Sequence, residues 1–374
     1  MELYVHIPFC VRKCLYCDFL SFPAREEEKK AYIKALKREI RFKGQQYKEK
    51  ERITSIFFGG GTPSLLTGEE MESLLFCLRE SFHIEKDAEI SMEANPGTLN
   101  REKLAAYKRA GINRLSLGCQ SVHDEELKRL GRIHSFSEFK ENYELAREIG
   151  FDNINVDLMA ALPGQTLSSF KDCLHRIVSL SPEHISAYSL IIEEGTPFYE
   201  REDQLDLPDE DTERDMYAAC RKILKEAGYL QYEISNYAKE GFACRHNTGY
   251  WDGTPYLGLG LGASSYVEYC RFKNVQGLSE YIENAGRDHF PKEEWEELTL
   301  NNRMEEYMFL GLRMLDGVSI AAFEQRFGLS MQAVYGEKIE QFVREKLLTI
   351  RKNRVCLTEK GLDLANRVMA GFLL

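Results

Sequence analysis

Residues 3–19 read LYVHIPFCVRKCLYCDF, in which a short apolar run leads directly into three closely spaced cysteines. The run Leu3–Pro8 is rich in β-forming residues and predicts a strand. Cys10, Cys14 and Cys17 follow it with the spacing C-x3-C-x2-C, so a single loop can present three thiolates. Because the other seven cysteines are scattered, this cluster indicates metal binding or catalysis rather than a disulfide framework.

Five further β-rich runs follow, and longer amphipathic stretches separate them. The strands that we expect are Leu3–Pro8, Ser55–Gly60, Glu89–Asn95, Arg114–Gln120, Ile154–Ala160 and His184–Ile192. The helices that we expect between them are Glu26–Lys43, Gly68–Arg79, Arg101–Ala110, Ser135–Ile149 and Thr166–Leu180. This alternation predicts an α/β fold with a parallel sheet and right-handed crossovers. Six units are too few for a closed eight-stranded barrel, so we expect a partial (β/α)6 TIM-like barrel that binds ligands at the carboxyl ends of its strands.

The chain divides into three expected parts. Residues 1–195 form the barrel and 196–290 form a mixed segment, and an acidic passage at 193–215 crosses the boundary between them. Residues 291–374 predict a mostly helical, winged-helix-like C-terminal domain. Its expected helices are Asn302–Leu315, Ile320–Phe327, Gln332–Glu345 and Glu359–Ala370, and its expected strands are Leu347–Arg351 and Arg354–Leu357. The expected helix Gln332–Glu345 is acidic on balance, which favours packing or partner binding over binding to DNA.

Charge and hydropathy exclude several classes of protein. The 374 residues include 49 Lys and Arg against 60 Asp and Glu, so the net charge is −11. An acidic chain is a poor general binder of nucleic acids, and we expect no nucleic-acid partner. No apolar run approaches the roughly 20 residues of a membrane helix, and the N-terminus shows no signal-peptide pattern. We therefore expect a cytoplasmic protein with at most peripheral membrane contact.

The residues alone leave the metal of the cysteine loop open. Three thiolates can hold three irons of a 4Fe-4S cluster and leave the fourth iron without a protein ligand. The same thiolates can hold zinc if His6 supplies a fourth ligand. Farther along the chain, Gly59, Gly60 and Gly61 precede Thr62, and the lack of a Cβ allows backbone groups to approach a ligand closely. A tight turn is the alternative reading of these glycines.

Several longer motifs resemble those of the radical S-adenosylmethionine (SAM) enzymes, and most closely their HemN-type branch. They are YVHIPFC at 4–10, FFGGGTPS at 57–64, EANPGTL at 93–99, SLGCQS at 116–121, LGRIH at 130–134, NVDLMAALPGQT at 155–166 and YSLIIEEGTP at 188–197. The resemblance implies a 4Fe-4S cluster on Cys10, Cys14 and Cys17, whose open iron is chelated by exchangeable SAM. It assigns Arg132 to the methionyl carboxylate, and Gln120 and Asp157 to the ribose hydroxyls. The remaining cosubstrate residues that it implies are Tyr4, Tyr16, Gly60, Gly61, Thr62 and Glu93.

Some of these positions also have ordinary structural interpretations. Tyr16 can stack on adenine or simply pack against apolar neighbours. Glu93 can be a solvated carboxylate at a strand end. Asp157 can be a helix N-cap, although Pro163 places the next helix late for that role.

The chain departs from the oxidases of this branch at its N-terminus. Those proteins carry a long N-terminal extension and a further cysteine two residues after the third, whereas here nine residues precede Cys10 and Asp18-Phe19 follow Cys17. These features resemble the HemW subfamily, whose members are regarded as heme chaperones.

The segment CRHNTGYW at 244–251 contains the H-N-x-x-Y-W motif that is associated with heme in that subfamily. The resemblance makes His246 the expected axial ligand, with Asn247, Tyr250 and Trp251 as further heme-binding residues. Arg245 is a candidate for a heme propionate, and Cys244 is a weaker candidate for the iron. The alternative is a turn with a structural histidine.

We therefore expect a HemW-type heme chaperone that binds heme and transfers it to acceptor hemoproteins, respiratory ones among them, and that forms a homodimer. Its cluster and SAM would be structural or regulatory, and no residue is assigned to catalysis. The alternative is an enzyme of porphyrin biosynthesis, an oxygen-independent coproporphyrinogen III dehydrogenase that decarboxylates propionates to vinyl groups. A nucleic-acid regulator is the weakest reading because of the charge.

Overall fold

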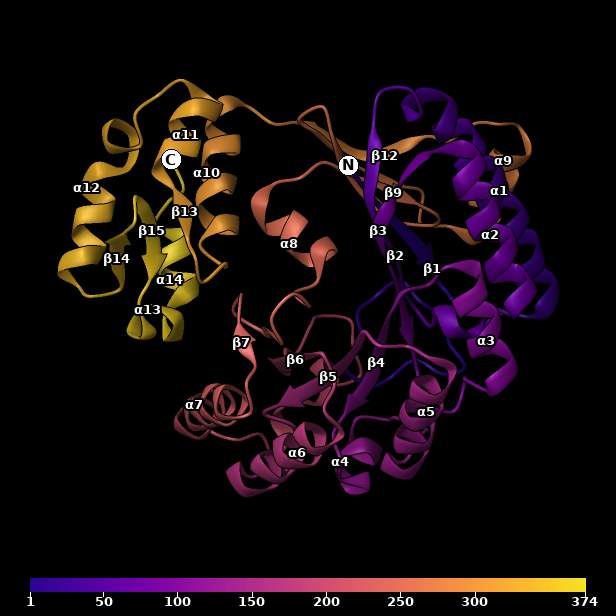
Figure 1. Ribbon diagram of the computed structural model, residues 1–374, viewed down its shortest axis with the longest axis horizontal. Coiled ribbons are helices and arrows are strands. Elements are labelled where there is room, and N and C mark those ends of the chain that lie inside the picture. The colour runs from indigo at the N-terminus through magenta and orange to yellow at the C-terminus, as the bar shows by residue number, and fades with distance from the viewer.

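A computed structural model describes all residues from Met1 to Leu374. Its centre is a sheet whose first six strands are parallel and follow one another in chain order. They are β1 (Glu2–Ile7), β2 (Arg52–Gly60), β3 (His83–Ala94), β4 (Arg114–Gln120), β5 (Ile154–Ala160) and β6 (His184–Ser189). The predicted parallel sheet is thus confirmed, and its strands form an open arc (Figure 1).

Helices cover the outer face of this arc (Figure 1). They are α1 (Glu26–Tyr47), α2 (Gly68–Ser81), α3 (Arg101–Ala110), α4 (Asp124–Arg129), α5 (Phe136–Ile149) and α6 (Leu167–Leu180). Thr67, Ser135 and Thr166 each begin a helix with a capping box, in which the side chain accepts a backbone N–H three residues on. The short helix α4 was not expected from the sequence.

Alternation along the strands separates an apolar outer face from a polar inner face. In β1, Leu3, Val5 and Ile7 are fully buried in the main apolar core. The positions between them carry Glu2, Tyr4 and His6. The inner face of the barrel is therefore lined by polar and aromatic side chains, as a ligand-binding lumen requires.

The expected mixed segment, together with the first residues of the expected C-terminal domain, extends the sheet at both edges. At one edge, β9 (Tyr256–Leu259) runs parallel to β1, and antiparallel strands β10 (Ser264–Val267), β11 (Cys270–Asn274) and β12 (Lys292–Glu297) follow. At the other edge, β8 (Asn236–Ala238) pairs antiparallel with β6, and β7 (Leu230–Gln231) pairs antiparallel with β8. The sheet thus has twelve strands instead of the expected six.

The other elements of this segment are helical. The acidic passage contains two short 3-10 stretches within Tyr199–Gln204, and α7 (Glu210–Glu226) follows with Asp209 as its N-cap. Helix α9 (Leu278–Gly286) packs on α1. Another 3-10 turn, Pro63–Leu65, follows β2. Helix α8 (Arg245–Asp252) stands inside the open side of the arc, between β2 and the C-terminal domain (Figure 1).

The C-terminal domain has its own apolar core. Its elements are α10 (Leu300–Gly311), β13 (Val318–Ser319), α11 (Ile320–Phe327), α12 (Met331–Arg344), β14 (Leu348–Arg351), β15 (Arg354–Leu357), α13 (Glu359–Asp363) and α14 (Ala365–Ala370). The order β13-β15-β14 adds a third strand to the predicted hairpin. The last expected helix is two helices, because Leu364 adopts φ −122° between them.

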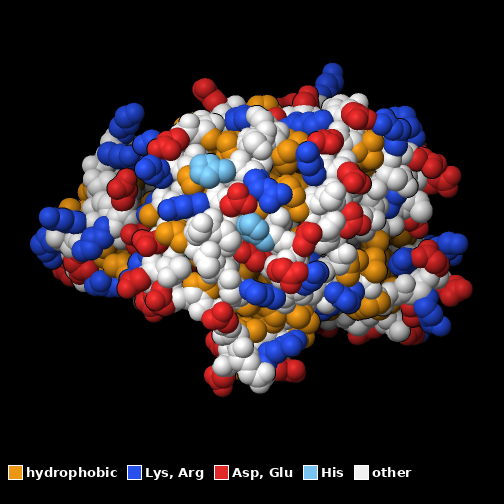
Figure 2. Space-filling model, turned by 90° about the horizontal axis from the view of Figure 1, so that it is seen from below, with side chains coloured by type: hydrophobic (Ala, Val, Ile, Leu, Met, Phe, Trp, Pro, Cys, Tyr) orange, Lys and Arg blue, Asp and Glu red, His pale blue; other side chains and the backbone are white.

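No helix is both long and apolar enough to cross a membrane. On the face shown in Figure 2, cationic and anionic side chains are interspersed, and no broad basic area is visible there.

Candidate functional site

The three cysteines of the loop after β1 are free, half-buried thiols. Backbone hydrogen bonds tie this loop to distant parts of the chain: the amide of Leu15 donates to the carbonyl of Leu130, and that of Phe198 donates to Leu15. No three His, Cys, Asp or Glu side chains converge as ligands of a single metal ion. The thiols are therefore held on one ordered loop but do not meet at one point.

His6 is not free to complete a zinc site with these thiols. Its Nε2 lies 2.8 Å from the carbonyl oxygen of Leu20, which can only accept, so Nε2 carries the proton. Its Nδ1 therefore accepts from the hydroxyl of Tyr4 at 3.0 Å. Both ring nitrogens are used within the protein.

Arg132 lies beside the cysteine loop and is linked to it twice. Its Nη1 is 3.7 Å from the Sγ of Cys14, and its Nη2 donates to Asn95 Oδ1 at 2.9 Å and to the carbonyl of Gly118 at 2.8 Å. Asn95 in turn donates to Thr62 Oγ1, which lies 3.4 Å from the Sγ of Cys10. A guanidinium and a chain of polar groups thus adjoin two of the thiols, a setting suited to an anionic cluster and a ligand carboxylate.

Glu93 faces the same end of the lumen, where its Oε2 accepts the amide of Gly60 at 3.1 Å. Burial, and secondarily the charge of Asp157, raise the pKa of Glu93 to about 7. This carboxyl can therefore hold or release a proton near neutral pH.

Protein atoms fill the space that a Cβ would take at two of the glycines after β2. Gly60 has φ +106°, and a Cβ there would overlap the imidazole of His6. At Gly61 a Cβ would lie 2.7 Å from the carbonyl oxygen of Phe9. The close approach that we expected toward a ligand is thus, at Gly60 and Gly61, an approach to β1 and the cysteine loop. The tight-turn interpretation accounts for these two glycines.

Gln120, Asp157 and Tyr16 lie at the carboxyl ends of the strands or near them. Gln120 ends β4 with φ +65°, and its Oε1 accepts from the hydroxyl of Tyr188 at 3.2 Å. Asp157 accepts from Asn155 at 2.7 Å and from Ser116 at 3.1 Å, and burial raises its pKa. Tyr16 packs partly against a small apolar cluster. These contacts orient the three side chains from within the protein.

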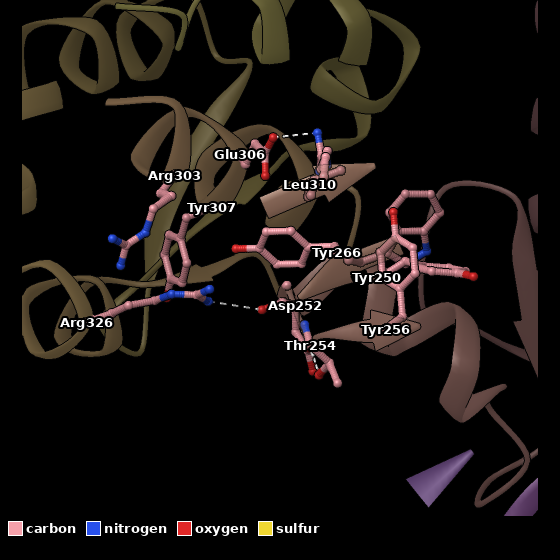
Figure 3. A pocket seen from close by; sticks show the side chains of 13 residues that line it. Tyr250, Asp252, Thr254, Tyr256, Tyr266, Arg303, Glu306, Tyr307, Leu310 and Arg326 are labelled. Atoms are coloured by element: carbon pink, nitrogen blue, oxygen red, sulfur yellow. Dashed lines mark hydrogen bonds and ion pairs between the residues drawn. The ribbon is translucent and has the colours of Figure 1, made fainter. Parts of the chain in front are cut away.

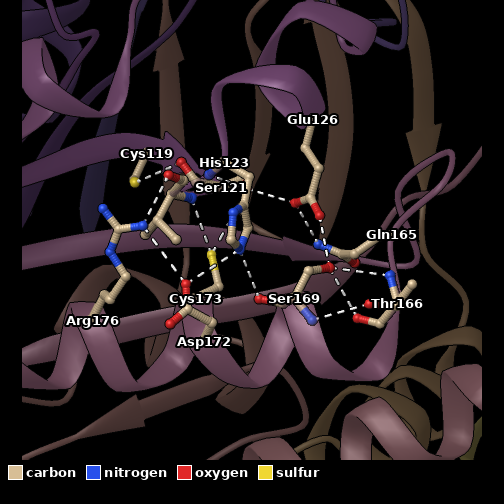
Figure 4. Close-up of polar contacts among 11 residues, drawn as sticks. Cys119, Ser121, His123, Glu126, Gln165, Thr166, Ser169, Asp172, Cys173 and Arg176 are labelled. Carbon is tan, nitrogen blue, oxygen red and sulfur yellow. Dashed lines mark hydrogen bonds and ion pairs between the residues drawn. The ribbon is translucent and has the colours of Figure 1, made fainter.

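A buried hydrogen-bond network supports the turn that follows Gln120 (Figure 4). The carboxylate of Glu126, on α4, accepts from Ser121 Oγ at 2.6 Å, from Gln165 Nε2 at 3.0 Å and from Ser169 Oγ at 2.8 Å. Ser121 is the residue after Gln120, and Ser169 belongs to α6. Sequence reasoning missed this network, because nothing in the local pattern distinguishes Glu126 from its exposed acidic neighbours.

His246 is a buried residue of α8 with both ring nitrogens bonded. Its Nδ1 lies 2.8 Å from Ser55 Oγ and its Nε2 lies 3.0 Å from the hydroxyl of Tyr250. Its ring stacks on Phe57 at 5.1 Å. Burial and the charge of Arg114 lower the pKa of His246 to about 3, so the imidazole is neutral. In this arrangement the ring has the environment of a structural histidine, and iron ligation would require Nε2 to leave Tyr250.

The residues before His246 point elsewhere. Cys244 is fully buried, its thiol contacts Glu89 at 3.3 Å, and burial raises its pKa to about 12. Arg245 is engaged with the backbone and carboxylate of Asp87. A buried protonated thiol is a poor ligand, so the structure does not support Cys244 as a heme contact. Arg245 is exposed and directed away from the lumen.

Tyr250 and Trp251 line a small pocket of about 20 Å³ between α8, the edge strands β9–β11 and the helices α10 and α11 (Figure 3). Tyr250 packs edge-on against Tyr256, with the ring centroids 4.7 Å apart. Arg271 and Glu306 form an ion pair of 2.6 Å across this pocket. Half-buried Asn247 makes no side-chain hydrogen bond.

Stacked rings connect the cysteine end of the lumen to α8. Tyr4 lies 6.5 Å from Phe57, Phe57 lies 5.1 Å from His246, and His246 lies 4.9 Å from Tyr250, measured between ring centroids. Helix α8, which carries the H-N-x-x-Y-W motif and is called the motif helix below, therefore closes the barrel lumen from the side opposite the cysteine loop. His246 and Tyr250, which the sequence assigned to heme, thus share one interior with Tyr4, which it assigned to SAM, whereas Trp251 lines the pocket between α8 and the C-terminal domain.

Comparison with known proteins shows which family the chain belongs to. Residues 4–177 match the model of the Radical SAM superfamily, and residues 298–364 match that of the HemN C-terminal domain. The chain is 39% identical to "Heme chaperone HemW" of Lactococcus lactis over 99% of this chain and 97% of that protein. It is 38% identical to "Heme chaperone HemW" of Bacillus subtilis over 99% and 98%.

A solved structure extends this agreement to the whole fold. Coproporphyrinogen III oxidase (HemN) of Escherichia coli, described as a Radical SAM enzyme, superposes with a TM-score of 0.87 at 25% identity, over 100% of this chain and 89% of that one. Together with the near full-length identity to the two relatives, these matches establish that the chain belongs to the HemW family of the radical SAM superfamily.

Proposed function

We propose that this protein is a heme chaperone, which binds heme and transfers it to acceptor hemoproteins while carrying a 4Fe-4S cluster with exchangeable SAM. The observation that carries the proposal is the near full-length identity to proteins named heme chaperones, which includes both the cysteine loop and the motif helix. Polar side chains line the lumen between the cysteine loop and α8, which supports a common role for these two features.

Cys10, Cys14 and Cys17 would hold the cluster, which when bound supplies a low-potential electron. The contacts of Arg132 with Cys14 and Asn95 support its assignment to the carboxylate of SAM, because a guanidinium has five donors and the protein uses only some of them. The other residues assigned to SAM are Tyr4, Tyr16, Gly60, Gly61, Thr62, Glu93, Gln120 and Asp157. Replacement of any one of the three cysteines by Ala should abolish the visible absorbance after anaerobic reconstitution. An unchanged spectrum in all three variants would refute the assignment.

For heme, His246, Asn247, Tyr250 and Trp251 remain the predicted motif residues. If His246 binds the iron, Tyr250→Phe removes the competing hydrogen bond to Nε2 and should preserve or strengthen hemin binding, whereas His246→Ala should weaken it. Hemin titrations followed at the Soret band measure both variants. Wild-type affinity in His246→Ala would remove the axial-ligand role.

The transfer step defines a chaperone. Hemin-loaded protein should restore activity to a heme-depleted hemoprotein, such as a respiratory b-type one, faster than free hemin does at the same concentration. No transfer from a protein that is fully loaded with hemin and cluster would contradict the proposal. We further propose a cytoplasmic homodimer with at most peripheral membrane contact, which sedimentation with and without the reconstituted cluster tests.

One observation favours a second candidate. The likeness to coproporphyrinogen III oxidase covers the whole chain, so an oxygen-independent coproporphyrinogen III dehydrogenase is the alternative. Anaerobic incubation with coproporphyrinogen III, SAM and reductant decides between the two. Vinyl porphyrinogens over several turnovers would support the dehydrogenase, and their absence from cluster-replete protein would support the chaperone.

A further inference from the structure

A groove separates the barrel from the end of the C-terminal domain. It holds about 600 Å³ between the end of β6, helix α7, and the helices α13 and α14. This volume is far larger than that of the pocket beside α8 and lies within the range of roughly 300–1,000 Å³ that small ligands occupy. Both domains contribute walls, so its occupant would contact both.

Four arginines and three carboxylates, Glu210, Glu213 and Asp363, line this groove, so its net charge is +1 in a chain whose net charge is −11. Arg214 and Arg221 come from α7, Arg313 follows α10, and Arg367 lies on α14. Each is paired with a protein carboxylate; for example, Arg221 lies 3.2 Å from Asp363 across the groove. In the pairs of Arg214, Arg221 and Arg367 both side chains remain partly exposed, so these pairs are weak and can be exchanged for carboxylates of a ligand. The partner of Arg313, Glu233, is buried, so that pair stays in place.

Apolar side chains lie between these cations. Ile191, just after β6, is 68% exposed, which is unusual for an isoleucine, and Leu190, Ile234, Leu362 and Leu364 lie near it in the lining. No histidine, cysteine or methionine lines the groove. The lining therefore fits a ligand with a broad apolar body and carboxylates at its edge, and it offers no imidazole or sulfur ligand for iron.

Two contacts connect the groove to the site already described. Tyr188 lines it and donates to Gln120, one of the residues assigned to SAM. On the other side, the guanidinium of Arg313 lies 4.3 Å above the indole of Trp251, a residue of the motif helix. Trp251 thereby acts as a positioning residue for a groove cation.

We infer that this groove binds the macrocycle and propionates of the tetrapyrrole, and that recognition there does not depend on iron. The inference rests on the proposed heme-handling function and assigns its binding surface. The motif helix acts on this surface through the contact between Trp251 and Arg313, apart from any ligation by His246.

The test uses the full chain with its cluster reconstituted and two iron-free probes, protoporphyrin IX and its dimethyl ester, whose fluorescence reports binding. The double variant Arg221→Gln/Arg367→Gln should weaken binding of the diacid roughly tenfold or more but leave binding of the ester unchanged. Ile191→Asp should weaken both probes. Because this isoleucine is mostly exposed, the substitution leaves the fold intact.

Two further variants complete the experiment. Trp251→Leu should weaken binding of the diacid more than that of the ester, an effect that a merely structural role would not produce. Arg109→Gln, which removes an exposed ion pair with Glu72 on the barrel exterior, is the matched control and should change neither.

Each other outcome overturns the inference in a distinguishable way. Wild-type affinity for both probes in the groove variants would place the tetrapyrrole elsewhere and leave the chaperone function standing. Binding of hemin without binding of iron-free porphyrin would show that iron ligation directs recognition. If the wild-type protein binds neither hemin nor porphyrin, the proposed function fails and the groove assignment fails with it.

Discussion

Asn95 and Glu93 end the same strand run two residues apart, yet they act on the cysteine end of the lumen in different ways. Asn95 bonds Arg132 and Thr62 and so joins the two groups that contact the thiols. Glu93 instead accepts a backbone amide and has an elevated pKa because little water solvates its charge. Asn95 thus orients the groups near the thiols, whereas Glu93, two residues earlier, can change its protonation state near neutral pH.

Glu93 should make stability depend on pH in a defined window. Its pKa is raised from 4.5 to about 7 in the folded chain, so the folded state binds more protons than the unfolded state between these values. Stability from this group therefore falls as pH rises through that window. We expect Glu93→Gln to gain stability relative to wild type from pH 4.5 to 7, by up to roughly 3 kcal/mol. Urea unfolding of the SAM-free protein measures the difference, with exposed Glu69→Gln on α2 as the control. A difference that does not change with pH would contradict the elevated pKa.

At the scale of elements, α4 connects two loops of the candidate site. Its Glu126 binds the turn after Gln120 to the start of α6, and Arg132 follows the end of the helix. A six-residue helix has little stability of its own, so these tertiary contacts keep it in place.

Loss of the Glu126 carboxylate should be costly, because two buried donors, Ser121 and Gln165, and half-buried Ser169 would lose their acceptor. We expect Glu126→Ala to reduce the free energy of unfolding by roughly 2–4 kcal/mol and to weaken SAM binding to the reconstituted protein. The neighbouring Glu125→Ala removes only an exposed ion pair with Lys128 and should cost less than about 1 kcal/mol. Denaturant unfolding compares the two variants. Equal effects would mean that the network does not hold the turn.

At the scale of the whole molecule, the two large apolar cores are separate clusters, which polar contacts and the side chain of Ile234 join. Glu233, fully buried beside β8, accepts from Ser235 and Asn236 and lies 3.5 Å from Arg313 of the C-terminal side. The amide of Leu315 also donates to the carbonyl of Tyr232. This junction explains why α10 ends at Gly311 instead of continuing to Leu315.

Removal of Glu233 should uncouple the barrel from the C-terminal domain. Glu233→Ala leaves Arg313 without its partner, and we expect a loss of roughly 2–4 kcal/mol, less than for a fully buried pair because Arg313 is partly exposed. In calorimetry the C-terminal domain should then unfold at a lower temperature than the barrel. The exposed Glu226→Ala at the end of α7 is the control. A single unshifted transition would show that the apolar contacts suffice.

The sequence by itself determined the parallel strands, most of the helices and the loop that carries the three thiols. These features depend on local periodicity, helix caps and residue spacing, which the chain carries wherever it folds. The family resemblance could be recognised on the same local motifs. Only the tertiary structure decided the features that these local signals do not encode. The charged strand Lys292–Glu297 has no strand pattern and forms by pairing with β11.

The same limit applies to the site. Whether His246 faces solvent or stacks on Phe57 depends on α8 entering the barrel, and no local pattern encodes that contact. Glu126 and Arg313 likewise acquire their roles from partners dozens of residues away. Burial, pKa and hydrogen-bond partners are properties of the assembled interior. The residue types could therefore be read from the chain, but their environments came only from the fold.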